Sequence, residues 1–178
     1  MPNQYPQEAV LRDGHRLLIR PFASHDAEAL FKFFQALPGE TRRFAWNPIE
    51  SRTLVDSWAE NIDYSKVFPL LALEGTRVVA DMTLHRRTAG PLRRVGRIKW
   101  LIDAEFRGRG LGSLLVSHFI GIARREGLHH LTCMLISELE ADAVRVLADQ
   151  GFQAFHFPGY GVDPDGTPQD MTKMVLKL

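Results

Sequence analysis

VGRIKWLIDAEFRGRGLGSLLVSHFIGIARR, the stretch from Val95 to Arg125, decides the fold. It begins with β-branched and aromatic residues, passes through a glycine-rich segment and continues with apolar residues at intervals of three and four. This pattern predicts a strand, a glycine loop and a helix that lays one apolar face on a sheet. The residues expected on that face are Leu111, Leu114, Leu115, Phe119 and Ile122.

The glycines of this stretch lie just before and within the first turn of the predicted helix, at Gly108, Gly110 and Gly112. The first N–H groups of a helix lack internal partners and carry partial positive charge. Glycine removes the side chains that would keep a ligand away from these donors. The segment therefore predicts a site for a phosphate or diphosphate group.

Two common nucleotide-binding motifs fit this segment poorly. A P-loop ends in Gly-Lys-Ser/Thr, whereas Gly112 is followed by Ser113 and Leu114. A Rossmann fingerprint needs G-x-G-x-x-G and an acidic residue about 20 residues further on. The spacing here is G-x-G-x-G, and the next predicted strand, His130–Ile136, ends without that acidic residue. A nicotinamide-dependent oxidoreductase is therefore the least favoured of the functions considered.

Arg107, Gly110 and Gly112 make the stretch resemble the acetyl-CoA motif of the GNAT superfamily of N-acetyltransferases, written Arg/Gln-x-x-Gly-x-Gly/Ala. A second segment, Glu140–Phe152, resembles the GNAT pattern Asn-x-x-Ala-x-x-Leu-Tyr-x-x-x-Gly-Phe. The matching positions there are Ala143, Gly151 and Phe152. A narrower resemblance, to the acetyltransferase domains of bacterial protein-lysine acetyltransferases, rests on Leu17-x-Ile19-Arg20-Pro21, Phe33-Phe34-x-x-Leu37, Arg43-Phe44 and Ile62-Asp63-Tyr64.

The resemblance implies an α/β (α+β) fold, in which a mixed, mostly antiparallel sheet is flanked by helices and its central strands splay apart. It also implies acetyl-CoA as co-substrate, with the pantetheine arm between the splayed strands, and a primary amine on a small molecule or a protein lysine as acceptor. The residues that it implies for binding acetyl-CoA are Trp100, Leu101, Ile102, Arg107, Gly108, Arg109, Gly110, Leu111, Gly112 and Ser113.

The catalytic groups of the family are not all present. Leu147 stands where many relatives have a tyrosine that protonates the leaving thiolate, and Arg97 where relatives often have a glutamate base. The candidate bases are Asp81 and His85, and the candidate proton donors are Ser137 and Tyr160. An alternative that stays equally open is a structural role for Asp81, in which it pairs with Lys99 or Arg97 on the neighbouring strand. The replacements also leave open a catalytically weak or inactive acyl-CoA-binding regulatory module.

The remaining elements follow from turn and periodicity signals. Asp13-Gly14 predicts a two-residue turn in an N-terminal hairpin. Ser24 is the expected N-cap of a helix that ends before Pro38, and a second helix is expected over Arg52–Ile62. The other expected segments are strands Pro69–Leu73, Arg77–His85, His130–Ile136, Gln153–Phe157 and Met171–Leu178, a solvated arginine loop Arg86–Arg94, and a glycine- and proline-rich loop Pro158–Gln169.

Length and composition predict one ordinary globular domain over residues 1–178, since domains typically run to roughly 100–200 residues. The chain is 45% hydrophobic and 24% charged, and its net charge of +1 argues against a nucleic-acid partner. Cys133 is the single cysteine, which excludes an internal disulfide and a multi-cysteine metal site. No membrane segment, metal or signal peptide is expected, so the cytoplasm is the predicted compartment. A homodimer is one assembly that this interpretation allows.

Overall fold

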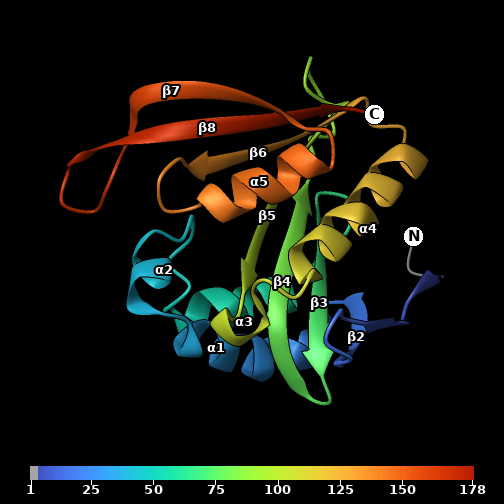
Figure 1. The fold of residues 1–178 in the computed structure, drawn as a ribbon. Helices are drawn as coiled ribbons and strands as arrows, with labels where there is room; N and C mark the ends of the chain where they lie inside the picture. The colour runs from blue at the N-terminus through green and yellow to red at the C-terminus, as the bar shows by residue number, and fades with distance from the viewer. Residues whose placement is uncertain (1–3) are drawn as a thin grey trace. The chain divides into compact units, whose positions relative to one another are not determined.

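The computed structural model describes residues 4–178 (Figure 1). Its strands form an eight-stranded sheet in the order β1-β2-β3-β4-β5-β6-β8-β7. The strands are β1 Gln7–Val10, β2 Arg16–Pro21, β3 Val67–Glu74, β4 Arg77–His85, β5 Val95–Ile102, β6 His130–Ile136, β7 Gln153–Val162 and β8 Pro168–Lys177. The α-helices are α1 Ala27–Ala36, α2 Gly39–Arg43, α3 Arg52–Glu60, α4 Leu111–Arg125 and α5 Ala141–Asp149.

The mixed sheet and its flanking helices confirm the predicted fold class. β5 and β6 pair in parallel, whereas the pairs β1–β2, β2–β3, β6–β8 and β7–β8 are antiparallel. The chain falls into two compact units. Unit 1 runs to Thr83 and includes Trp100–Leu111, and unit 2 comprises Leu84–Lys99 and Gly112–Leu178.

Unit 1 begins with the predicted hairpin, but its turn is longer than two residues. β1 ends at Val10, which pairs with Arg16, and the Leu11 N–H donates to the His15 carbonyl at 2.9 Å. Leu11 is buried, because its side chain turns into the core instead of continuing the strand. The prediction from Asp13-Gly14 was therefore right about the position of the turn and wrong about its length, since residues 11–15 connect the two strands.

Ser24 is not the N-cap of α1, which was a wrong prediction. A short 3-10 turn covers Ser24–Asp26, and α1 follows directly after the buried Asp26. The Asp26 carboxylate accepts hydrogen bonds from Arg20 at 2.6 and 2.7 Å and from the Ala23 N–H at 2.8 Å. This network fixes the chain ahead of the helix. α2 is a further short helix that the sequence patterns did not predict.

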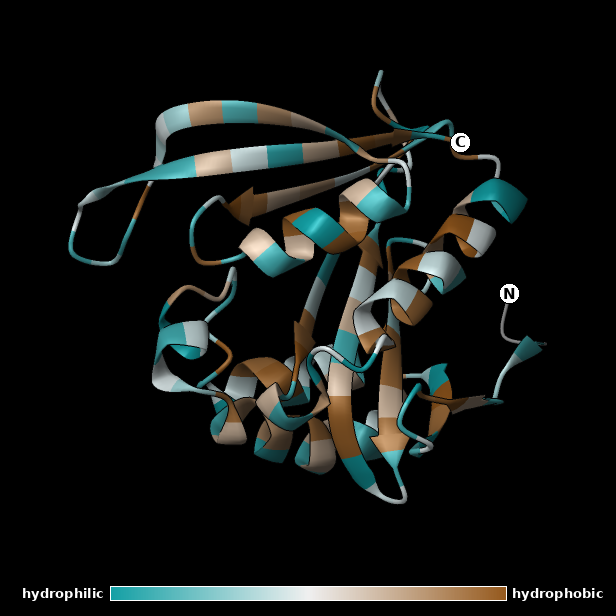
Figure 2. Cartoon of the chain, viewed as in Figure 1, coloured by the Kyte–Doolittle hydropathy of each residue, from teal (hydrophilic) through white to brown (hydrophobic). Residues whose placement is uncertain are grey.

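The core of unit 1 lies where α1 and α3 meet β3 and β4. Leu30, Phe33 and Phe34 of α1 are buried together with Val55 of α3 and Leu71 of β3. α3 starts at an N-cap, Ser51, whose hydroxyl accepts from the Leu54 N–H at 3.3 Å. Figure 2 shows the apolar run of β3 in brown. A nearly continuous apolar strand of this kind is typical of a strand buried on both faces.

Unit 2 is built on β6, which pairs with β8 along its whole length, from His130 to Ile136. Its parallel pairing with β5 covers the first residues of both strands, Val95–Arg97 and His130–Thr132. On α4, the predicted apolar face is buried at Leu111, Leu115, Phe119 and Ile122, while Leu114 is only partly buried.

The prediction of a loop over Pro158–Gln169 was wrong, because this segment forms the end of β7, the turn and the start of β8 in a long β-hairpin. β7 reaches Val162 and pairs with β8 through Gly161–Gln169 and Val162–Pro168, with an irregularity between Phe157 and Gly161. β7 is the last strand in the sheet order, and proline and glycine are tolerated at such edges and at bulges. The connecting turn is shorter than predicted, at 163–167.

Candidate functional site

The glycine-rich segment between β5 and α4 lies in unit 1. A 3-10 turn, Ala104–Phe106, is capped by the Asp103 side chain, which accepts from the Glu105 N–H at 3.0 Å. Gly108 and Gly110 then have φ of +72° and +89°, and α4 begins at Leu111. Only glycine adopts such φ values without strain. The backbone therefore turns sharply just ahead of a helix N-terminus, where N–H groups lack partners in the helix.

The two arginines of this loop are held differently. Arg107 donates through Nε to the Ile102 carbonyl at 3.3 Å and through Nη2 to the Thr41 hydroxyl at 3.4 Å. Arg109 forms an ion pair with Asp13, in which Nη1 lies 2.7 Å from Oδ2. The Arg12 N–H also donates to the Arg109 carbonyl at 3.5 Å. The β1–β2 turn is thus a support for the glycine loop, which the sequence alone did not indicate.

Phe106 anchors the same loop from inside, since its side chain is buried. The guanidinium of Arg109 lies 5.4 Å from the Phe106 ring centre, and that of Arg77 lies 5.9 Å from it. Arg77 in turn pairs with Asp103 at 2.6 Å and with Glu105 at 2.9 Å. Arg77 and Arg109 therefore stabilise the loop, and both have carboxylate partners.

Three of the residues predicted to bind acetyl-CoA form the end of β5. Ile102 is buried, whereas Trp100 and Leu101 are partly exposed. The Asp103 N–H donates to the Val79 carbonyl at 2.9 Å, which fixes the end of β5. Gly112 and Ser113 continue in the first turn of α4. Of the residues predicted to bind acetyl-CoA, Trp100–Ile102 and Arg107–Leu111 therefore lie in unit 1, on one strand–loop segment.

Asp81, a candidate base, lies in β4 within unit 1. Its side chain is partly buried, and burial raises the pKa of its carboxyl to about 7. Among residues 4–178, we find no hydrogen bond or ion pair to this carboxylate. A carboxyl group with a pKa near neutrality and no partner is suited to exchange a proton with a substrate.

His85, the other candidate base, lies in unit 2. Burial lowers its pKa to about 4, aided by the positive charges of Lys99 and Arg97. Burial and the Arg97 charge also lower the pKa of Lys99 to about 8. At neutral pH the His85 imidazole is therefore neutral and weakly basic. The two candidates on β4 thus differ, and Asp81 is the one whose pKa matches general-base work near pH 7.

The candidate proton donors Ser137 and Tyr160 both lie in unit 2. The Ser137 hydroxyl lies 2.7 Å from the Thr172 hydroxyl, which in turn lies 3.0 Å from His156 Nδ1. Thr172 is buried, so it links a half-buried serine to an exposed histidine. The Tyr160 side chain is 69% exposed, and its ring contacts that of Phe157 at 5.5 Å between centres.

Two further residues of unit 2 bear on the departures from the family pattern. Leu147 is fully buried, so its position is a packing position here. Glu140, where the pattern has asparagine, accepts from the Ile136 N–H at 2.6 Å. Cys133 is buried, and burial raises the pKa of its thiol, as expected of an unreactive core cysteine.

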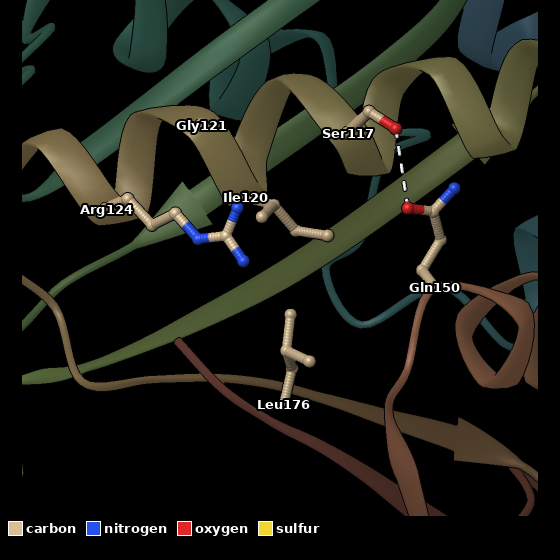
Figure 3. Close-up of a pocket in the computed structure, with 6 residues that line it drawn as sticks. All are labelled: Ser117, Ile120, Gly121, Arg124, Gln150 and Leu176. Atoms are coloured by element: carbon tan, nitrogen blue, oxygen red, sulfur yellow. Dashed lines mark hydrogen bonds between the residues drawn. The ribbon is translucent and has the colours of Figure 1, made fainter.

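Unit 2 also contains a shallow cavity of about 320 Å³ between α4, the end of α5 and β8 (Figure 3). Ile120 and Leu176 supply its apolar surface, and Arg124 extends along one side. The Ser117 hydroxyl and the Gln150 side chain are 3.4 Å apart. None of the residues that line it is among the predicted site residues.

In the part of the chain that the structure describes, we find no cluster of side chains suited to hold a metal ion. Nor is any described helix long and apolar enough to cross a membrane.

A family comparison matches residues 16–153 to the acetyltransferase (GNAT) domain. Acetyltransferase PA5475 of Pseudomonas aeruginosa is 28% identical over 182 residues, which cover 93% of this chain and 87% of that protein. The match includes both units and the whole strand–loop–helix segment.

Solved structures share the fold at lower identity. The GNAT domain of S. lividans PAT superposes with a TM-score of 0.81 at 23% identity, covering 100% of this chain and 99% of that one. The yncA protein of Salmonella typhimurium, whose structure includes its cofactor acetyl-CoA, superposes with a TM-score of 0.76 at 23% identity. That superposition covers 91% of this chain and 94% of the yncA chain.

Proposed function

The chain belongs to the acetyltransferase (GNAT) domain family and is an N-acetyltransferase, and we propose that it transfers the acetyl group of acetyl-CoA directly to a primary amine. We treat residues 1–178 as one acetyltransferase domain. The family match supports this, because it runs from residue 16 to residue 153 through both units.

One observation carries the proposal of acetyl-CoA as co-substrate, namely the conformation of the loop before α4. The positive φ values of Gly108 and Gly110 bend the chain just ahead of Leu111. A Cβ built at Gly108 would meet nothing within 4 Å, so the backbone there is open to a ligand. An anion suits this place, because the N–H groups of a first helical turn are unpaired and the helix dipole is positive there. The residues present therefore fit the diphosphate of the coenzyme.

In the proposed reaction the amine nitrogen attacks the thioester carbonyl, the C–S bond breaks, and the amine loses a proton. We assign the removal of that proton to Asp81, because a carboxylate with a pKa of about 7 is half ionised at neutral pH. The backbone N–H of Ile102 or of its neighbour is the proposed donor to the oxyanion that develops on the carbonyl.

The leaving thiolate needs no dedicated acid in this proposal. A thiol has a pKa of about 8.5, so the thiolate is a fair leaving group near neutral pH. The buried Leu147 then serves packing, and water protonates the sulfur. Ser137, held by Thr172, and the exposed Tyr160 remain candidate donors that variants can test.

The acceptor is proposed only as a primary amine. Asp163 and Asp170 of the C-terminal hairpin carry negative charge that could attract a cationic amine, but both carboxylates accept hydrogen bonds from the hairpin backbone. Asp163 accepts from the Asp165 and Thr167 N–H groups at 2.9 and 2.8 Å, and Asp170 accepts from the Gly159 N–H at 2.7 Å. These hydrogen bonds give both carboxylates a structural role. The two aspartates therefore do not indicate which amine is the acceptor.

The test is release of free thiol from acetyl-CoA in the presence of amines, with a protein, peptide, polyamine and amino-acid panel. We expect amine-dependent thiol release for at least one class and acetylated product by mass spectrometry. Calorimetry with acetyl-CoA runs in parallel. Binding without turnover across the panel would favour the regulatory module, and absence of binding would overturn the proposal.

A further inference from the structure

Arg12, in the turn between β1 and β2, lies against the glycine loop. Its backbone N–H donates to the Arg109 carbonyl at 3.5 Å. A Cβ built at Gly110 would lie 3.4 Å from Arg12 Nε and 3.7 Å from its Cδ. The Arg12 side chain therefore runs beside the loop, on the side that Gly110 leaves free of a side chain.

The guanidinium groups near this loop fall into two kinds. Arg109 is paired with Asp13, and Arg77 is paired with Asp103 and Glu105. Within the described chain, Arg12 has no carboxylate at ion-pair distance, and Arg107 contacts a carbonyl and a hydroxyl instead. Arg12 and Arg107 thus bring two uncompensated positive charges to a loop whose backbone donors already favour an anion.

We propose that Arg12 is a coenzyme-binding residue whose guanidinium contacts a phosphate group of acetyl-CoA at the Arg107–Gly110 loop. Arg109 is then a positioning residue, held in place by Asp13. Arginine suits this task because its planar fork makes charge-assisted hydrogen bonds with phosphate oxygens. Arg12 lies outside the glycine motif and reaches it only through the fold. This inference rests on the proposed use of acetyl-CoA.

The experiment compares Arg12→Ala and Arg12→Lys with the wild-type protein. Loss of a charge-assisted contact should raise the Kd for acetyl-CoA in Arg12→Ala roughly tenfold or more, with kcat at saturation within about twofold. Arg12→Lys should recover part of the affinity, because it restores the charge. The matched control is Arg16→Ala, an exposed arginine of the same hairpin, which should bind acetyl-CoA as the wild type does.

Acetyl-dephospho-CoA identifies the phosphate involved. If Arg12 contacts the 3′-phosphate, Arg12→Ala and wild type bind this analogue equally; if it contacts the diphosphate, the roughly tenfold difference persists. Both outcomes support the proposal. Equal binding of acetyl-CoA by a folded Arg12→Ala and by wild type overturns it while leaving the proposed function intact. Failure of the wild type itself to bind acetyl-CoA overturns the proposed function, and this inference with it. Melting temperatures show whether each variant is folded.

Discussion

The carboxylate of Asp13 lies 2.7 Å from the guanidinium of Arg109, so an ion pair joins the turn after β1 to the loop before α4. These residues are far apart in sequence, and both lie in unit 1. The pair is accompanied by the hydrogen bond from the Arg12 N–H to the Arg109 carbonyl and by the Arg109 guanidinium over the Phe106 ring. The glycine loop is therefore held in its bent conformation before any ligand arrives, which reduces the ordering cost of binding.

Gly110→Val should abolish tight binding of acetyl-CoA while leaving the protein folded. Valine is strained at φ +89°, and its side chain would fill the space between the loop backbone and Arg12, whose Nε lies 3.4 Å from the Cβ position. We expect a Kd at least tenfold higher by calorimetry, since about 1.4 kcal/mol of lost binding already gives that factor.

Gly90→Val is the matched control for this variant. Gly90 has φ +79° and open space around its Cβ position, so the same substitution meets similar backbone strain outside the glycine loop. It should bind acetyl-CoA as the wild type does. Normal binding by a folded Gly110→Val protein would contradict the placement of the diphosphate.

The strand–loop–helix segment could be predicted from the sequence because its signals are local. Its β-branched and aromatic residues identified β5, periodicity identified α4, and the loop glycines correspond to the positive φ values that the structure has at Gly108 and Gly110. The same local signals failed for Pro158–Gln169, because proline and glycine are usual in turns and their tolerance at an edge strand depends on the neighbouring β8.

Of the candidate site, only the glycine loop and the start of α4 could be predicted from the sequence. Arg12 and Asp13 reach the loop through contacts between distant parts of the chain, and no spacing rule in the sequence reveals them. The choice between Asp81 and His85 also needed the structure, because burial moves their pKa values in opposite directions. Both residues follow the same strand alternation, so periodicity alone treats them alike.

Asp81→Asn should remove the base and lower kcat/KM by about 100-fold or more, the usual scale of general-base catalysis. In the wild type, kcat/KM should rise with pH through an apparent pKa near 7, as the Asp81 carboxyl ionises. His85→Gln is the control from the same strand, and it should keep that rise because His85 is already neutral. An unchanged pH profile in Asp81→Asn would show that another group is the base.

Asp81→Asn should also make the protein more stable at alkaline pH. The Asp81 pKa is raised from 3.8 to about 7 by burial, so the native state binds the proton more tightly than the unfolded state. Its contribution to stability is full below pH 4 and is lost as pH rises to 7. Three pKa units correspond to about 4 kcal/mol at most. Urea unfolding at pH 5 and pH 8 measures this, and a variant no more stable than wild type at pH 8 would contradict the burial of an unpartnered carboxylate.

His85→Gln should reduce the acid sensitivity of folding. The His85 pKa is lowered from 6.5 to about 4, so the unfolded state binds the proton more tightly and wild-type stability falls as pH drops from 6.5 to 4. Glutamine cannot be protonated, so the free energy of unfolding should fall less over that range, by up to about 3 kcal/mol. Urea unfolding of both proteins at pH 7 and pH 4.5 measures this. An equal fall in the free energy of unfolding of wild type and His85→Gln would contradict the prediction.

Thr172→Val should destabilise the protein by about 1–2 kcal/mol, although valine matches threonine in shape. The buried Thr172 hydroxyl bonds both the Ser137 hydroxyl, at 2.7 Å, and His156 Nδ1, at 3.0 Å, and valine leaves these groups without that partner. Thr88→Val, at an exposed position of the β4–β5 loop, is the control and should change stability by less than about 0.5 kcal/mol. Chemical denaturation at pH 7 measures both. Equal stability of Thr172→Val and wild type would mean that water replaces the hydroxyl without cost, and that Ser137 is not held by Thr172.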